Sequence, residues 1–257
     1  MKSSWAEIRG RRERLTAVLL QEGYLSVSDL AGRFEVSEAT IRRDLSALEK
    51  DNRITRTHGG ALSEFDALFV PFYQRNMQNR EAKQRVARAA LPLLTGARVV
   101  FLDAGSTVYA VAEAIVQSRL ELRVVTNSLP VAEVLTSSAA VETHLLGGCL
   151  LPRQLIVVGP GATLSLSAWR LDLSLLSAEG VDEQGLWNSQ DDITGFQRHV
   201  QGRSERCAFC LDASKLGHAA PSFLLPWSLV DSVVSDARPD QILALGEDAA
   251  TADWIAA

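Results

Sequence analysis

The sequence predicts an α/β protein made of two parts, a small helical domain at the N-terminus and a larger domain in which parallel strands alternate with helices. The first 60 residues contain three segments with apolar residues at helical spacing. From residue 98 onward, short apolar runs alternate with helical segments, which is typical of a parallel sheet covered on both faces. The 257 residues are enough for one small and one medium domain.

The composition is that of an ordinary globular protein. With 47% hydrophobic and 22% charged residues the chain can bury a core, which excludes collagen, coiled-coil rods and disordered chains. Its three cysteines are too few for a disulfide framework, and the charged N-terminus does not resemble a secretory signal. No apolar run approaches the roughly 18 residues of a spanning helix. We therefore expect a cytoplasmic protein without a membrane partner.

Three helices are predicted at the N-terminus. The first covers about Trp5 to Gln21 and ends at Gly23. A short second helix follows the serine-rich cap at 26–28, and Ser37 caps a third helix from Glu38 to Lys50. Because only a tight turn separates the last two helices, this part of the chain has the pattern of a helix-turn-helix, whose last helix lies in the major groove of DNA.

The third helix has one apolar stripe and one open face. The stripe consists of Ile41, Leu45 and Leu48, at positions i, i+4 and i+7. The open face and its flanks carry Thr40, Arg42, Arg43, Ser46 and Ala47. Arginine can donate two hydrogen bonds to guanine or to a phosphate, so this face is a candidate for reading DNA. The alternative is a charged surface that only keeps the domain soluble.

The segment after the third helix predicts a small β-wing. Arg53 to His58 alternates polar and β-favouring residues and ends in a Gly-Gly pair. Arg56 and His58 would lie beside a turn that can approach the minor groove or a phosphate, although His58 equally fits a histidine that only completes the turn. The first 60 residues carry eleven Lys or Arg and nine Asp or Glu, a net charge of +2, whereas the remainder carries −7. The relatively basic N-terminus thus favours a DNA-facing domain.

The predicted domains are residues 1–61, a linker at 62–80, and residues 81–257. The linker assignment depends on the absence of periodicity between Ala61 and Arg80, where Pro71 also lies. A helix is predicted from Glu81 to Leu94, with further helices at Thr107–Gln117 and Pro130–Ser137. Six strands are predicted, and their arrangement suggests a Rossmann-like sheet: Arg98–Asp103, Leu122–Thr126, Val141–Leu146, Leu173–Ser177, Cys207–Asp212 and Ser232–Asp236.

Small polar residues follow four of the predicted strands. They are the segments 103–107 (DAGST), 126–128 (TNS), 147–148 (GG) and 212–215 (DASK). In the first segment, glycine allows close approach of an anion, hydroxyls add donors and the next helix points its positive end at the same place. Open α/β sheets bind ligands at the carboxyl ends of their strands, so the four segments predict one phosphate-accepting crevice. Each segment alone also fits an ordinary turn.

Three blocks near the N-terminus resemble the winged helix of the DeoR family of bacterial transcription regulators. They are 27–34 (VSDLAGRF), 37–45 (SEATIRRDL) and 56–61 (RTHGGA). The resemblance implies a winged helix-turn-helix that binds double-stranded operator DNA, as a repressor of a carbohydrate-metabolism operon and as a homodimer or homotetramer. The DNA-contacting residues expected are Ser37, Thr40, Arg42, Arg43, Ser46, Arg56 and His58.

The four polar strand ends resemble, in the same order, the C-terminal sensor domain of that family. This resemblance implies a fold similar to ribose-5-phosphate isomerase and a phosphorylated sugar or related metabolite as effector. The effector-contacting residues it implies are Asp103, Gly105, Ser106, Thr107, Thr126, Asn127, Ser128, Gly147, Gly148, Arg153, Asp182 and Lys215. The chain departs from the family pattern at Ser177 and over 194–200 (TGFQRHV), where Arg198 or His199 could replace a missing lysine.

Other chemistry is not expected. Cys207 and Cys210 have CxxC spacing, but residues three apart in a strand point to opposite faces, so we interpret both as core residues. The four histidines lack the spacing of metal ligands, and no nucleotide-binding glycine motif occurs. We therefore expect no metal, no cofactor and no catalytic residues. An isomerase-type enzyme that acts on sugar phosphates is the alternative, because Asp103, Asp182 or Asp212 could serve as a general base.

Overall fold

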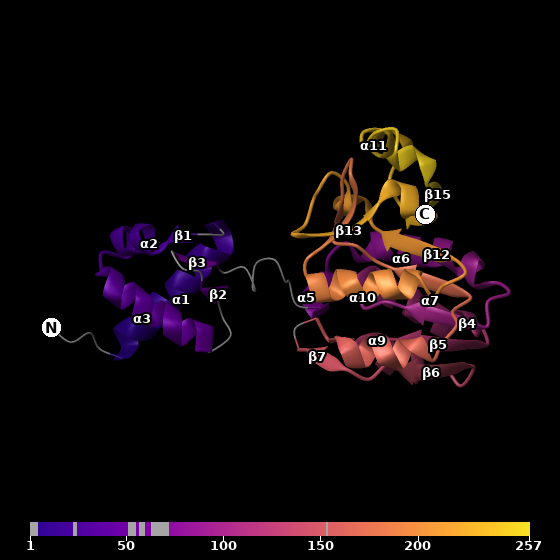
Figure 1. Cartoon of the computed structure of the whole chain (residues 1–257), viewed down its shortest axis with the longest axis horizontal. Coiled ribbons are helices and arrows are strands. Elements are labelled where there is room, and N and C mark those ends of the chain that lie inside the picture. Colours follow the sequence, from indigo (N-terminus) through magenta and orange to yellow (C-terminus); the bar gives the residue numbers. More distant parts are fainter. Residues whose placement is uncertain (1–4, 23–24, 51–54, 57–59, 63–71, 153) are drawn as a thin grey trace. The chain divides into compact units, whose positions relative to one another are not determined.

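The structure is a computed structural model, and it describes residues 5–22, 25–50, 55–56, 60–62, 72–152 and 154–257. The chain divides into two compact units, Met1–Val70 and Pro71–Ala257 (Figure 1). Each unit has its own hydrophobic core, and each is described by itself.

The first unit contains three helices and a small antiparallel sheet. The helices are α1 (Trp5–Glu22), α2 (Val27–Phe34) and α3 (Glu38–Lys50). The strands β1 (Leu25–Ser26), β2 (Thr55–Arg56) and β3 (Gly60–Leu62) pair in the order β1-β3-β2. A core of Leu15, Val27, Leu30, Ile41, Leu45 and Leu48 joins the helices. The predicted winged helix-turn-helix is confirmed, including the buried stripe of α3.

The second unit is built on a seven-stranded parallel sheet. Its strands are β4 (Val99–Leu102), β5 (Leu122–Thr126), β6 (Val141–Leu145), β9 (Leu173–Leu176), β12 (Cys207–Leu211), β14 (Ser232–Ser235) and β15 (Asp253–Ala256). They lie in the order β15-β14-β12-β9-β4-β5-β6, and every pairing is parallel. The six predicted strands are present, and β15 adds an edge strand that the sequence analysis did not predict.

Helices cover both faces of this sheet, because successive apolar side chains of the strands point to opposite faces and both faces must be buried. In β4, Phe101 packs toward α9 (Pro160–Ser167) and α10 (Asp191–Gln201) in one core. Its neighbours Val100 and Leu102 belong to a second core with α6 (Arg80–Ala90), α7 (Ser106–Ser118) and α8 (Leu129–Leu135). Figure 1 shows α9 and α10 together over one face. The parallel strands are therefore buried on both sides.

Shorter strands extend the second unit beyond the predicted sheet. The strands β10 (Gly180–Val181), β11 (Gly185–Asn188) and β13 (Ser222–Pro226) form an antiparallel sheet. A hairpin joins β7 (Cys149–Leu151) to β8 (Ile156–Val158), and α11 (Pro239–Leu243) lies near the C-terminus. The strands β7, β8 and β10 have only two or three residues, too few to show an alternation, which is why the sequence did not reveal them.

The structure divides the chain differently from the predicted linker at 62–80. Leu62 still belongs to β3, and a helix, α5 (Phe72–Met77), belongs to the second unit. Phe72 anchors this helix, because it is buried and its ring meets that of Tyr109 on α7 edge-on, with centroids 5.3 Å apart. The second unit therefore starts at Pro71 rather than at residue 81. A helix of six residues is too short to show a helical period in the sequence.

The two cysteines of β12 lie as predicted. Cys207 belongs to the core beneath α9 and α10, whereas Cys210 belongs to the core on the opposite face. Both are buried, and burial raises the pKa of each thiol. Their sulfur atoms therefore cannot act as a pair, and the CxxC spacing here is a feature of the core.

Candidate functional sites

The start of α3 is a well-formed helix cap. The Ser37 Oγ accepts a 3.3 Å hydrogen bond from the Thr40 amide and lies 2.9 Å from the Thr40 hydroxyl. Both residues are accessible at the helix N-terminus, where amide groups and the helix dipole favour an anion. The turn before this cap includes Glu35, whose φ of 53° lies in the left-handed region. This conformation reverses the chain within a few residues and sets α2 against α3.

The two faces of α3 differ as predicted. Ile41, Leu45 and Leu48 are fully buried, while the side chains of Arg42 and Arg43 are exposed. The Arg42 guanidinium lies 2.8 Å from the Glu38 carboxylate, one turn earlier. Such an exposed pair contributes little to stability, so Arg42 remains available to another anion. Ser46 is half-buried on the flank of the helix.

A buried carboxylate fixes α3 to α1. Asp44 is almost inaccessible, and its two oxygens accept hydrogen bonds from Nε of Arg11 at 2.6 Å and from Nε of Arg12 at 2.9 Å. In the sequence these arginines are distinguished only as part of a charged N-terminus. The structure shows instead that they hold the candidate DNA-reading helix in place.

The wing is described only in part. Arg56 ends β2, which pairs with β3 through Arg56 and Ala61. His58 lies outside the described residues.

The second candidate site lies at the point where the order of the parallel strands reverses. The chain runs from β4 outward to β5 and β6 and then returns to β9 on the other side of β4. Asp103 follows β4, and Ser177 follows β9. The Asp103 Oδ2 accepts hydrogen bonds from the Ser177 amide at 3.2 Å and from its hydroxyl at 3.1 Å. Crevices at such reversals are the usual ligand sites of open α/β sheets.

Gln197 of α10 completes the surroundings of Asp103. Its Nε2 donates to Asp103 Oδ2 at 2.8 Å and to the Ser177 carbonyl at 2.8 Å, while its Oε1 accepts from Asn188 at 3.0 Å. Burial raises the pKa of Asp103, and the hydrogen bonds that it accepts oppose this shift. The Ser177 amide, the Ser177 hydroxyl and the Gln197 amide converge on one oxygen, and the backbone of Ala104 also favours the charged carboxylate. The other oxygen, Oδ1, is buried and has no hydrogen-bond partner within the described residues.

Two adjoining clefts open at this point. The first, here called the cation cleft, is lined by Arg75, Gln78, Asn79, Lys83, Gly105, Ser106, Thr107, Ser177, Ala178, Glu179, Asn188, Asp212, Ser214 and Lys215. The second, here called the Asp103 cleft, is lined by Arg75, Asp103, Ala104, Gly105, Gln154, Ile156, Ser177, Glu179, Asn188 and Ile193. The two share Arg75, Gly105, Ser177, Glu179 and Asn188, so together they form one continuous candidate site.

Three cationic side chains meet at the cation cleft. Lys215 follows β12, whereas Arg75 and Lys83 come from α5 and α6. The Lys83 ammonium donates hydrogen bonds to the carbonyls of Arg75 and of Gln78, the latter at 2.7 Å. Burial lowers the pKa of Lys83 to about 8, and Asp212 opposes this shift. Burial likewise lowers the pKa of Arg75, against the influence of Glu179 and Asp103.

The N-terminus of α7 also faces the cation cleft. Gly105 is its N-cap, and the hydroxyl residues Ser106 and Thr107 form its first turn. A β-carbon at position 105 would collide with the side chain of Ser177, so glycine allows β4 and β9 to bring their ends together. The amide groups of this turn and the cationic side chains offer the donors that bind phosphate in other proteins.

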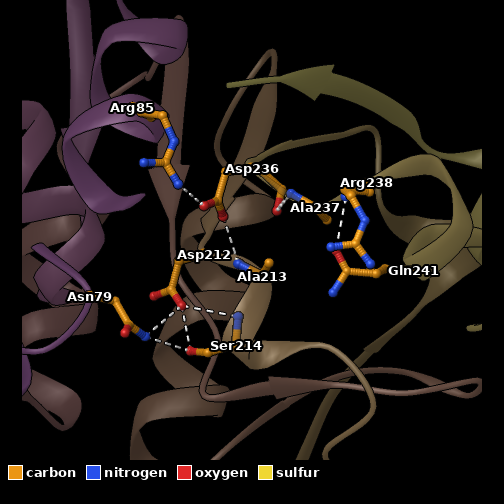
Figure 2. Close-up of polar contacts among 10 residues, drawn as sticks. Asn79, Arg85, Asp212, Ala213, Ser214, Asp236, Ala237, Arg238 and Gln241 are labelled. Carbon is orange, nitrogen blue, oxygen red and sulfur yellow. Dashed lines mark hydrogen bonds and ion pairs between the residues drawn. The ribbon is translucent and has the colours of Figure 1, made fainter. Parts of the chain in front are cut away.

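Polar contacts fix the far wall of the cation cleft (Figure 2). The Asn79 amide, just before α6, donates to Asp212 Oδ1 at 3.1 Å and to the Ser214 hydroxyl at 3.0 Å. On the next turn of α6, Arg85 lies 2.6 Å from Asp236, which follows β14 and accepts a hydrogen bond from the Ala213 amide at 2.7 Å. The loop that carries Lys215 is therefore tied to α6 at two points.

Several predicted effector residues lie outside both clefts. The hydroxyl of Thr126 donates to the Leu102 carbonyl at 2.6 Å, and Ser128 caps α8. Asn127 is fully buried next to them. Gly148 has a φ of 151° and packs against β8 and α9 beside Gly147. These residues build the turns at the ends of β5 and β6, as ordinary turn residues do.

Asp182 also has a local partner set. Its Oδ1 accepts hydrogen bonds from the Gln184 amide at 2.9 Å, the Gly185 amide at 3.2 Å and the Trp187 indole at 2.8 Å. It therefore shapes the turn between β10 and β11. Arg153 lies outside the described residues.

Arg198 and His199 of α10, one of which we expected to replace a missing lysine at the site, have other partners. Arg198 donates to the carbonyls of Leu224 at 2.9 Å and of Phe223, and His199 Nδ1 lies 2.8 Å from the Gly195 carbonyl. Neither residue lines either cleft. The cations that the sequence analysis missed are Arg75 and Lys83, because Arg75 fell in the predicted linker and Lys83 in an apparently ordinary amphipathic helix.

No group of three or more His, Cys, Asp or Glu side chains in the described part of the chain could hold a metal ion. No helix among those residues is long and apolar enough to cross a membrane.

Comparison with known protein families gives two matches that together span most of the chain. Residues 11–65 match the family described as the DeoR-like helix-turn-helix domain. Residues 78–237 match the family described as the DeoR C terminal sensor domain. The border between the two matches falls near the border between the two structural units.

Individual proteins match over nearly their whole length. The glycerol-3-phosphate regulon repressor of Escherichia coli is 33% identical over 89% of this chain and 91% of its own. The L-fucose operon activator of Haemophilus influenzae is 32% identical over 90% and 94%. Among solved structures, ribose 5-phosphate isomerase A from Methanocaldococcus jannaschii aligns with 54% of this chain and 55% of its own, at 18% identity and a TM-score of 0.39.

Proposed function

This chain belongs to the DeoR family of transcription regulators, and from that premise we propose that it is a repressor that leaves its operator when a phosphorylated sugar or related metabolite binds. The observation that carries the proposal is the combination, in one chain, of an exposed arginine face on α3 and a cleft with three cationic side chains. One relative is named a glycerol-3-phosphate regulon repressor, which supports the role of a repressor and a link to phosphorylated metabolites.

The DNA-binding part corresponds to residues 1–61 in this proposal. Its contacts to operator DNA are Ser37, Thr40, Arg42, Arg43, Ser46, Arg56 and His58. The exposed arginines of α3 would enter the major groove, while the cap formed by Ser37 and Thr40 would hold a phosphate. Helix-turn-helix proteins read paired half-sites as symmetric oligomers, so the proposed working form is a homodimer or homotetramer in the cytoplasm.

The effector-binding part extends from Pro71 in this proposal. Gly105, Ser106, Thr107 and Lys215 line the cation cleft and remain our proposed phosphate contacts. Thr126, Asn127, Ser128, Gly147, Gly148 and Asp182 would support the site from a distance, because they lie outside both clefts. Binding energy at the cleft controls DNA binding only if the ligand prefers one of two arrangements of the protein.

The proposal is tested by DNA binding to the region upstream of the chain's own gene, measured by fluorescence anisotropy at fixed salt. Sugar phosphates and sn-glycerol 3-phosphate are added one at a time. We expect specific binding that one phosphorylated compound relieves. The Lys215→Ala and Ser106→Ala variants should bind the DNA normally but fail to release it, whereas Arg123→Ala, at an exposed ion pair outside both clefts, should behave as wild type. The absence of specific DNA binding, together with turnover of a sugar phosphate, would instead support an enzyme.

A further inference from the structure

The strand β6 leaves one edge of the parallel sheet open (Figure 1). It is the last strand in the order β15-β14-β12-β9-β4-β5-β6, and among the described strands only β5 pairs with it. The five pairs of that ladder are in register, without a bulge. β6 also carries neither proline nor lysine, two residue types that proteins commonly place on exposed edges to prevent strand pairing. This edge can therefore accept another strand.

The hydrogen bonds to β5 show which backbone groups of β6 point outward. The Leu122 amide donates to the Ala140 carbonyl at 3.3 Å, and the Leu146 amide donates to the Thr126 carbonyl at 2.9 Å. Because successive residues of a strand direct their backbone groups to opposite sides, the even-numbered residues of β6 face β5. The amides and carbonyls of the odd-numbered residues, with Thr143 at the centre, point away from it.

The side chains of β6 match those of a second copy of the same strand. An antiparallel pair with its two-fold axis at Thr143 places Glu142 opposite His144 twice and Val141 opposite Leu145 twice. An acid then meets a histidine, and apolar residues meet each other. An axis at Glu142 would instead bring two carboxylates together, and an axis at His144 would set Glu142 opposite an apolar residue. The axis at Thr143 also aligns the outward backbone groups.

Two side chains of this edge lack full cover in the single chain. Leu145 is 47% exposed. Oγ1 of Thr143 is buried and has no hydrogen-bond partner in the described part of the chain. In the antiparallel pair, Val141 of the second copy would cover Leu145, and a second Thr143 directly opposite the first would offer its hydroxyl a partner.

The opposite edge of the sheet lacks such a match. The sequence of β15 is DWIA, so Asp253 is the only charged residue of that strand. Within an antiparallel pair of two β15 strands, no histidine or basic side chain can lie opposite Asp253. The complementarity is thus a property of β6 and not of edge strands in general.

We propose that two copies of the chain join through β6, as an antiparallel pair about a two-fold axis at Thr143, so that one sheet continues across the dimer. The Thr143 amide of each copy donates to the Thr143 carbonyl of the other, and each Leu145 amide donates to the Val141 carbonyl of the other. Glu142 of each copy lies beside His144 of the other. This inference rests on the proposed function, because a repressor that reads paired half-sites needs a two-fold arrangement.

Charge variants of the full chain test this pairing, with the molar mass measured by analytical ultracentrifugation over a range of concentrations. Glu142→Lys removes the acid opposite His144, and His144→Glu sets two carboxylates opposite each other. We expect each variant alone to dissociate about tenfold or more readily, to half the mass of the wild type. In an equal mixture the introduced lysine meets the introduced glutamate, and the native Glu142 meets the native His144. The mixture should therefore regain the mass of the wild type.

Arg123 provides the matched control. It contacts the same Glu142 carboxylate at 2.8 Å, but from β5, one strand behind the edge. Arg123→Ala should therefore assemble as the wild type does. Equal dissociation of this variant would mean that the exposed charge cluster, and not the edge of β6, controls assembly, which would overturn the inference.

A disulfide tests the register of the pair. Opposite residues that share no hydrogen bonds in an antiparallel pair have Cα atoms about 4.5 Å apart, which suits a disulfide. In chains that also carry Cys149→Ser, to remove the exposed thiol, a mixture of the Glu142→Cys and His144→Cys variants should crosslink on mild oxidation. Neither variant alone should crosslink, because position 142 of one copy does not lie opposite position 142 of the other.

The outcomes separate this inference from the function on which it rests. If the wild type forms an oligomer whose mass the charge variants do not change, or if the mixed cysteine variants do not crosslink, only the β6 interface is overturned. If the wild type is a monomer that binds its operator and releases it with a phosphorylated compound, the inference fails and the repressor remains. A monomer without specific DNA binding contradicts both. Should a charge variant not fold, the cysteine mixture still decides.

Discussion

Nε of Arg11 on α1 donates a 2.6 Å hydrogen bond to Oδ2 of Asp44 on α3, across 33 residues of sequence. Arg12 approaches the other oxygen of the same carboxylate at 2.9 Å. The Asp44 side chain is only 3% exposed and that of Arg11 only 10%, so water screens this pair weakly. The helix proposed to read DNA is thus positioned by its apolar stripe and by one buried ionic contact.

The first prediction concerns the loss of this contact. Asp44→Ala leaves the buried Arg11 guanidinium without its counter-charge, and breaking such a pair costs about 3–5 kcal/mol. We expect faster hydrogen exchange of the α1 and α3 amides and a corresponding loss of DNA binding. Arg9→Ala removes an exposed pair with Glu13 on the same helix and should change the exchange little. If the α1 and α3 amides of both variants were equally protected from hydrogen exchange, Asp44 would not be needed to hold α3.

The second prediction separates the two arginines of the α3 surface. Arg43→Ala should weaken operator binding by about 1–3 kcal/mol if the side chain reads a base. If the side chain contacts a phosphate, the variant should instead lower the slope of log affinity against log salt concentration by about one. Arg42→Ala should act similarly. Because Glu38 holds Arg42 at 2.8 Å and adds a negative charge near the DNA, Glu38→Gln should strengthen binding. Anisotropy titrations at several salt concentrations measure all three effects, and unchanged binding in both arginine variants would remove α3 from the interface.

Much of the architecture could be predicted because its signals are local. The stripe of Ile41, Leu45 and Leu48 and the Ser37 cap specify α3, and the apolar runs specify six strands of the parallel sheet. By contrast, β15 (Asp253–Ala256) has a mixed sequence, DWIA, and becomes a strand because β14 lies beside it. Its residues are half-buried or exposed at the edge of the sheet, so the segment lacks the buried apolar run by which the other strands were predicted.

The lining of the candidate cleft was predictable near the strand ends and not between the elements. Ser106, Thr107 and Lys215 lie shortly after β4 and β12, and the polar pattern at the strand ends had named them as candidate contacts. Arg75 and Lys83 reach the cleft because Phe72 anchors α5 against α7 and because α6 packs beside it. Conversely, Asp182 and Gly148 have the residue types of a binding site, but the structure uses them in turns. Residue type alone does not distinguish a turn from a ligand contact.

The third prediction concerns the pH dependence of effector binding. Burial lowers the pKa of Lys83 to about 8, and Arg75, Asp212 and Lys215 are the charged groups that influence it. A bound phosphate favours the charged ammonium, so its pKa rises in the complex. Above about pH 7, where a phosphomonoester is a dianion, affinity should therefore be steady up to about pH 7.5 and fall as the pH rises through 8, up to tenfold per pH unit between the free and bound pKa values of Lys83.

Calorimetry in buffers of different ionisation enthalpy measures this linkage directly. We expect the wild-type complex to take up a proton near pH 8.5. Lys83→Arg, whose side chain stays charged throughout this range, should bind phosphate compounds without that uptake and with a flatter pH profile. If the arginine variant shows the same proton uptake as wild type, another group is responsible.

The last prediction concerns how Asp103 affects the stability of the folded protein. Burial raises the pKa of this carboxyl in the folded protein, so the folded state holds its proton more tightly than the unfolded state does. Its contribution to stability is therefore fullest below the ordinary carboxyl pKa and is lost as the pH rises through the raised pKa of the folded state.

Asp103→Asn removes this pH dependence. Its amide oxygen can still accept from Ser177 and Gln197, and its amide nitrogen takes the place of the unpaired Oδ1. We expect the variant to melt at the same or a higher temperature than wild type at pH 7, with an advantage that shrinks toward acid pH. Thermal unfolding between pH 5 and 8, with Arg123→Ala as the control, measures this difference. A variant that is less stable at pH 7 would mean that the carboxyl group is needed for folding, whereas the expected result would mean that burying this carboxyl group destabilises the folded chain.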